Sequence, residues 1–183
     1  MNNNSYFIVV DNFFFDKGNP NSSYKKFSQF ISKLDHSAKW SVLNTHLHED
    51  HCGKNHLVQK KLHAEVYARD KVEDFSFVSR LMDHVWGRPR MFTHNIFDRT
   101  VYDTDKGRRI EVIPTPGHSD DHVAFRIMPD NIIYSGDAIP LPVKKRYITT
   151  GENYIAEIES LKKLLVFAEN GSRFVSAHHG IVG

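Results

Sequence analysis

Thr45-His46-Leu47-His48-Glu49-Asp50-His51 is the stretch around which the rest of the sequence is organised. It holds three imidazoles and two carboxylates, and burying unpaired polar groups costs roughly 2–7 kcal/mol each. Neutral imidazole and carboxylate are the groups that divalent metals bind. His46 and His48 point the same way at an extended strand end, and Asp50 and His51 follow in the turn. The motif therefore predicts a metal site, with two ions.

The alternative is a polar surface loop that happens to be rich in histidine, because short motifs of this kind also occur by chance. The metal prediction depends on whether further ligands follow other strands. His118, Asp137 and the pair His178-His179 each come directly after an apolar segment and beside a glycine. Loops at strand ends commonly carry function, so these residues are expected to meet at one rim with the His46 motif.

Composition sets limits on the kind of protein. At 183 residues, the chain is expected to form one compact domain over residues 1–183 that buries about two-thirds of its unfolded surface. The net charge of +2 gives no basic stripe for nucleic acid. A single cysteine, Cys52, and the absence of a signal peptide predict a reducing, cytoplasmic location. No segment is long enough to span a membrane.

Hydrophobic periodicity predicts the regular elements. Strands are expected over 6–10, 13–15, 40–43, 65–68, 109–113, 122–128, 132–135 and 174–176. Helices are expected over 24–34, 57–62, 72–85 and 155–168, and long loops over 88–105 and 140–150. Strands come first and then alternate with helices, twice over, which suggests two sheets with helices outside them.

Five blocks of sequence occur in a fixed order: Tyr6 to Gly18, His46-Leu47-His48-Glu49-Asp50-His51, Thr115-Pro116-Gly117-His118-Ser119, Ser135-Gly136-Asp137 and His179-Gly180. Together they resemble the metallo-β-lactamase-fold hydrolase superfamily over nearly the whole chain, with Lys17 where threonine is usual. The resemblance implies an α+β fold, an αββα sandwich of two mixed β-sheets with helices on the outer faces. The chain ends three residues after Gly180, where members commonly continue, as expected of a minimal or shortened member.

The resemblance also implies two divalent ions, zinc by default, with iron or manganese as alternatives. It assigns His46, His48 and His118 to the first ion. It assigns Asp50, His51 and His179 to the second ion, and Asp137 to both ions. His179 is preferred to His178 because the family ligand directly precedes glycine. Ions about 3.5–4 Å apart would lower the pKa of a shared water towards 7. The implied catalyst is a bridging hydroxide, with Asp50 and Asp137 as the catalytic residues.

The leading hypothesis for function is a metal-dependent hydrolase of a small ester, thioester or lactone. A phosphodiesterase or nuclease, an iron protein in redox or sulfur chemistry, and a slow-turnover binding protein are alternatives. The carboxylate of Asp137 argues against β-lactam hydrolysis, and no basic arm for tRNA is present. We expect a small-molecule substrate, no nucleic-acid or membrane partner, and leave oligomerisation open. Thr45 and His122 are candidates to support ligands, and residues 144–147 to contact substrate.

Overall fold

The computed structural model describes residues 7–21, 24–71, 84, 87–139 and 152–182. The helix expected over 72–85 lies outside these residues except for position 84, and so do the loop expected over 140–150 and the proposed substrate contacts at 144–147. The chain divides into two compact units, residues 1–98 and 99–183. The single domain over residues 1–183 stays a prediction.

The first unit contains a five-stranded sheet in the order β1-β2-β3-β4-β5. Its strands are β1 (Ile8–Val10), β2 (Phe13–Phe15), β3 (Ser41–Leu43), β4 (Glu65–Ala68) and β5 (Asn95–Ile96). β1 and β2 form an antiparallel hairpin, and β2 to β5 are parallel. Phe15 pairs with Leu43 at the carboxyl ends of β2 and β3, so the residues that follow these two strands leave the sheet at the same edge.

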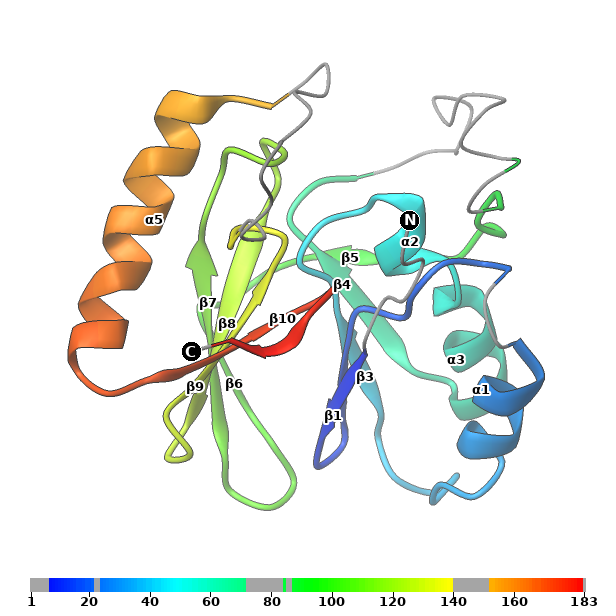
Figure 1. Ribbon diagram of the computed structural model, residues 1–183. Coiled ribbons are helices and arrows are strands. Elements are labelled where there is room, and N and C mark those ends of the chain that lie inside the picture. Colours follow the sequence, from blue (N-terminus) through cyan, green and yellow to red (C-terminus); the bar gives the residue numbers. More distant parts are fainter. Residues whose placement is uncertain (1–6, 22–23, 72–83, 85–86, 140–151, 183) are drawn as a thin grey trace. The chain divides into compact units, whose positions relative to one another are not determined.

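Helices of the first unit are α1 (Tyr24–Ile31), α2 (Glu49–Cys52) and α3 (Asn55–Leu62). α1 and α3 cover one face of the sheet (Figure 1). Between them and the strands lies a core that includes Phe14, Val42, Ile31 and Val58, all fully buried. The ring of Trp40 lies 5.1 Å from that of Phe14. This packing anchors β3, whose carboxyl end leads into the His46 motif.

The second unit contains a six-stranded sheet in the order β11-β10-β9-β8-β7-β6. Its strands are β6 (Val101–Asp103), β7 (Arg109–Pro114), β8 (Val123–Met128), β9 (Ile132–Gly136), β10 (Arg173–Ser176) and β11 (Gly180–Val182). β6 to β9 form an antiparallel meander, β10 is parallel to β9, and β11 is antiparallel to β10. The carboxyl ends of β7, β9 and β10 therefore lie at one edge, and each leads into a predicted ligand.

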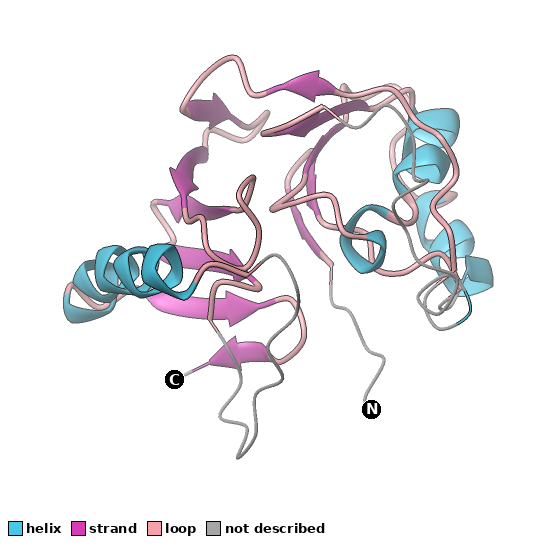
Figure 2. Ribbon diagram, turned by 90° about the horizontal axis from the view of Figure 1, so that it is seen from above, coloured by secondary structure: helices cyan, strands magenta, loops and turns pink. Residues whose placement is uncertain are grey.

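Helix α5 (Tyr154–Glu169) connects this edge to β10 and lies along one face of the second sheet (Figures 1 and 2). Leu164 packs into a core with Ile113, Ile133 and Phe174. Glu157 and Ser160 are also buried, whereas Ile155 is 79% exposed. The helix was predicted from its apolar period, yet two of its three buried residues, Glu157 and Ser160, are polar. Among the described residues, no helix is long and apolar enough to cross a membrane.

The predicted strands and helices in the described regions are confirmed to within two or three residues. The loop expected over 88–105 is wrong in part, because β5 and β6 lie within it. α2 and β11 were not predicted either. These four elements have only two to four residues each, too few to show a hydrophobic period.

Candidate metal centre

The first unit gathers the histidines of the His46 motif into one cluster. The ring centroid of His46 lies 4.4 Å from that of His48 and 4.1 Å from that of His51. Asp50 Oδ2 is 3.7 Å from His51 Nε2. His46 and His51 are fully buried. The cluster arises because the chain runs from β3 to His48, whose backbone is extended, and then turns at once into α2. This helix carries Asp50 and His51.

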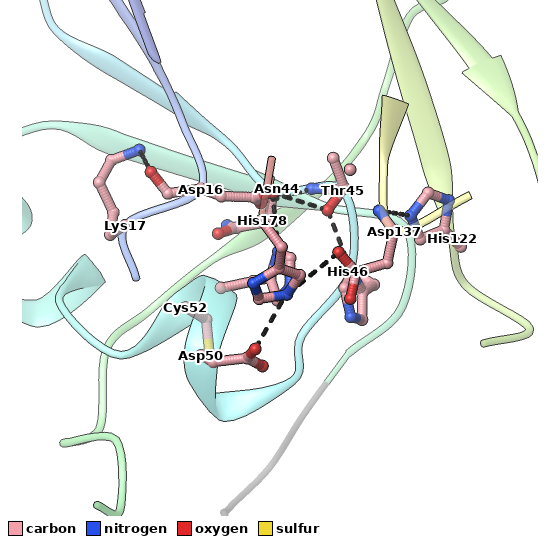
Figure 3. A network of polar contacts seen from close by, with 12 residues as sticks. Asp16, Lys17, Asn44, Thr45, His46, Asp50, Cys52, His122, Asp137 and His178 are labelled. Carbon is pink, nitrogen blue, oxygen red and sulfur yellow. Dashed lines mark hydrogen bonds and ion pairs between the residues drawn. The ribbon is translucent and has the colours of Figure 1, made fainter. Parts of the chain in front are cut away.

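Asp16 connects the two buried histidines of this cluster, His51 directly and His46 through Thr45; Figure 3 shows Asp16, Thr45 and His46. Its Oδ2 lies 2.9 Å from His51 Nδ1 and accepts a hydrogen bond from Thr45 Oγ1 at 2.8 Å. Its Oδ1 accepts one from Thr45 N at 2.9 Å, and Thr45 Oγ1 lies 3.0 Å from His46 Nδ1. Metal-binding histidines almost always use their second nitrogen in this way. With Nδ1 engaged, Nε2 is the nitrogen available to a metal.

A second layer of buried groups surrounds Asp16. Lys17 is fully buried; its Nζ donates to Asp16 O at 2.7 Å and lies 4.8 Å from the Phe14 ring centroid. Burial lowers the pKa of Lys17 well below its usual value. Burial likewise lowers the pKa of Lys54, which donates to Asn19 O, to about 8. Cys52 is buried as predicted, and burial raises its pKa, so its thiol is a packing group.

The second unit places two imidazoles against one carboxylate. His118 Nε2 lies 3.5 Å from Asp137 Oδ2, and His178 Nε2 lies 3.3 Å from Asp137 Oδ1. Two ligands of one tetrahedral zinc ion, each about 2.0–2.1 Å from it, lie about 3.4 Å apart. Both spacings fit this value. The imidazole and carboxylate donors fit zinc and equally iron or manganese.

His122 supports Asp137 from behind. Its Nε2 accepts a hydrogen bond from Asp137 N at 3.1 Å (Figure 3), and its Nδ1 lies 2.8 Å from Thr115 Oγ1. Because Nε2 accepts, the neutral ring carries its proton on Nδ1 and donates it to Thr115. The side chain is fully buried. Since both nitrogens are engaged, His122 holds the backbone of Asp137, the supporting role that the sequence suggested as one alternative.

Comparison with known proteins decides the family. The model of the metallo-beta-lactamase superfamily matches residues 41–174. The chain belongs to this superfamily. Its members are generally metal-dependent hydrolases and bind metal ions. The predicted α+β class and metallo-β-lactamase fold, with two mixed sheets, are confirmed.

Solved structures of the metallo-β-lactamase fold agree. An archaeal superfamily protein, ST1585 from Sulfolobus tokodaii, is 23% identical with a TM-score of 0.70, over 93% of this chain and 71% of that one. TTHA1623, solved in a di-iron-bound form, is 21% identical with a TM-score of 0.70, over 97% of this chain and 88% of that one. Identities this low show the fold alone.

A curated relative is the hydroxyacylglutathione hydrolase of Erythrobacter litoralis. It is 30% identical over 98 residues, which are 54% of this chain and 33% of that protein. The match thus spans about a third of the length of this relative. The activity of that relative is a property of its whole chain.

The sequence predicts that the last metal ligand of this superfamily member is one of two adjacent histidines, His178 and His179. His178 is the ring that faces Asp137 at 3.3 Å. The ring of His179 lies 6.2 Å from that of His178. Burial lowers the pKa of His179, helped by His178 and opposed by the nearby Asp137 carboxylate. The assignment of His179 stays a prediction, with His178 as the alternative that already contacts Asp137.

Gly117 gives a first test of how the His118 loop is held. Its φ is 145°, and a Cβ atom there would overlap the backbone of Glu157 in α5. We expect Gly117→Ala to destabilise the protein by more than about 3 kcal/mol, from steric overlap plus backbone strain. Gly107→Ala is the matched control, because its φ is 83° with nothing within 4 Å. Urea unfolding measures both, and equal losses would contradict the close packing.

Proposed function

We propose that the chain is a metal-dependent hydrolase that holds two divalent ions and acts on a small ester, thioester or lactone. The proposed ligands are those that the sequence assigns: His46, His48 and His118; Asp50, His51 and His179; and Asp137 to both ions. The observation that carries the proposal is the position of Asp137. One carboxylate oxygen faces Nε2 of His118, and the other faces Nε2 of His178, the alternative to His179 as the last ligand. This is the arrangement expected of a carboxylate that bridges two ions.

Neutral imidazoles are what the proposal requires. The rings of His46, His48 and His51 lie 4.1–4.4 Å apart in two pairs, and protonated rings at such spacing would repel each other. Contacts at Nδ1 of His46 and His51 orient both rings, so that Nε2 is the nitrogen that would bond to a metal. These features support metal binding more than a chance cluster of surface histidines, because His46 and His51 are buried.

The chain's own residues define the rest of the chemistry. When bound, two ions supply Lewis acidity and lower the pKa of a water to about 7. Asp50, which is partly exposed beside His51, would orient that water and accept its proton. Cys52 is excluded as a nucleophile, because burial raises the pKa of its thiol and its Sγ contacts Leu47 O. Hydrolysis by activated water therefore needs no covalent intermediate on the protein.

The proposed substrate class has separate support. The similarity to a hydroxyacylglutathione hydrolase favours a thioester among the three carbonyl substrates. A net charge of +2 favours a small molecule over nucleic acid. The di-iron form of TTHA1623 supports a second candidate, an iron-dependent activity, since the same donors bind iron.

A substrate panel tests the hydrolase proposal. Protein reconstituted with zinc, iron or manganese is assayed on a nitrophenyl ester, a thioester, a lactone and bis-nitrophenyl phosphate. We expect turnover of at least one carbonyl substrate, lost in His48→Ala and kept in His36→Ala, which changes an exposed histidine. Hydrolysis of the phosphodiester alone would overturn the substrate class, and no turnover with any metal would overturn the proposed function.

A further inference from the structure

A carboxylate outside the predicted ligand set lies behind His118. Glu152 Oε1 is 3.4 Å from His118 Nδ1, and its side chain is only 6% exposed. The other oxygen, Oε2, accepts a hydrogen bond from Tyr154 Oη at 3.2 Å. The carboxylate thus lies between a tyrosine hydroxyl and the imidazole, while Nε2 of the same imidazole faces Asp137.

The start of α5 fixes the position of Glu152. The next residue, Asn153, caps the helix by accepting a hydrogen bond from Ala156 N at 3.1 Å. Asn153 N donates to Gly117 O at 2.8 Å, one residue before His118. Ser160 Oγ, two turns along α5, donates to Pro116 O at 2.7 Å. The helix and the His118 loop are therefore joined at several points, and Glu152 lies beside His118 as a consequence.

We propose that Glu152 is a positioning residue that selects the Nδ1–H tautomer of His118 and orients its Nε2 towards a bound metal. The part of this inference that concerns metal binding rests on the proposed function. Asp16 offers the comparison, since its carboxylate contacts His51 Nδ1 at 2.9 Å in the other unit. A carboxylate behind a metal-binding histidine fixes the tautomer and raises the basicity of the ring.

Glu152 fits this role better than Glu157 and Glu159, two acidic residues in α5 itself. Glu159 is 64% exposed and pairs with Lys162 at 2.7 Å on the helix surface. Glu157 is buried, and its backbone and Cβ lie against Gly117. Glu159→Gln is therefore a matched control, since it also removes one carboxylate charge, from the helix that follows Glu152, without touching the His118 loop.

The test compares Glu152→Ala, Glu152→Gln, Tyr154→Phe and Glu159→Gln. Zinc affinity is measured by competition with a chelator, and the tautomer of His118 by ¹⁵N NMR of the metal-free protein above the usual histidine pKa of about 6.5. We expect Nδ1–H in the wild type and a mixture in Glu152→Ala. Zinc affinity should fall by about 10–100-fold in Glu152→Ala, less in Glu152→Gln and Tyr154→Phe, and not at all in Glu159→Gln.

Each outcome is decisive. An unchanged tautomer together with unchanged zinc affinity in Glu152→Ala and Glu152→Gln would overturn the inference. If Glu152→Ala fails to fold, the isosteric Glu152→Gln gives the result. A merely structural role would lower the thermal stability of the metal-free protein and leave the tautomer as it was. If the wild type bound none of zinc, iron and manganese, the proposed function would fail, while the NMR measurement would still test the contact between Glu152 and His118.

Discussion

Asp137→Ala is expected to lower kcat by more than about 100-fold, beyond the 10–100-fold typical of residues that only support a ligand. Asp137 contacts the Nε2 atoms of His118 and His178 through different oxygens, so its removal takes a proposed ligand from both ions. Steady-state hydrolysis of the substrate found in the panel measures the effect, with thermal unfolding as a check on the fold.

Asp103→Ala is the matched control for Asp137. It makes the same substitution in the same unit, at the end of β6, where the side chain is 79% exposed. We expect wild-type kcat and metal content. If Asp137→Ala kept more than about a hundredth of the wild-type rate, its loss would not exceed the 10–100-fold range of supporting residues, and the bridging role would be wrong.

Asp16→Ala is expected to lower the free energy of unfolding of the metal-free protein by about 3–5 kcal/mol. The buried carboxylate accepts hydrogen bonds from the backbone and hydroxyl of Thr45 and contacts His51 Nδ1. Its removal leaves these three groups without that acceptor, at sites where water does not replace it. Zinc affinity should also fall by about 10–100-fold, because His51 loses the group that orients it. Urea unfolding and chelator competition measure the two effects.

Asp35→Ala provides the control for Asp16. The Asp35 carboxylate also accepts a backbone and a hydroxyl hydrogen bond, from Ser37 N at 2.8 Å and Ser37 Oγ at 2.6 Å, but it is exposed. These hydrogen bonds hold the pKa of Asp35 below its usual value. Water can replace both bonds, so we expect a much smaller loss of stability. Similar losses in the two variants would show that burial of the Asp16 network contributes little.

Elements with a clear hydrophobic period were predictable from the sequence. The helix over 155–168 corresponds to α5 at Tyr154–Glu169, and the strand over 65–68 corresponds to β4. The order of His118, Asp137 and the His178 pair after apolar strands predicted that they leave one sheet edge, and the pairing of β7, β8, β9 and β10 agrees. The helices and strands could be predicted because hydrophobic periodicity is a property of residues that are close in sequence. The common edge could be predicted because each candidate ligand directly follows its strand.

Residues that support the proposed ligands could not be identified in the same way. Asp16 contacts His51 across 35 positions of sequence, and Glu152 contacts His118 across 34. No local pattern encodes such contacts; the only signal for Asp16 was an acidic residue directly after an apolar strand. The choice between His178 and His179 also depends on backbone direction after β10, which the adjacent glycine does not determine.

Elemental analysis of metal bound per chain is the most direct test of the account. The wild-type protein, reconstituted with zinc and freed of excess metal, is predicted to hold two ions per chain, and Asp137→Ala fewer than two. Two ions per chain in both proteins would contradict the ligand assignment. A wild-type protein that holds no metal after reconstitution with zinc, iron or manganese would contradict the claim that these histidines and carboxylates form a metal centre.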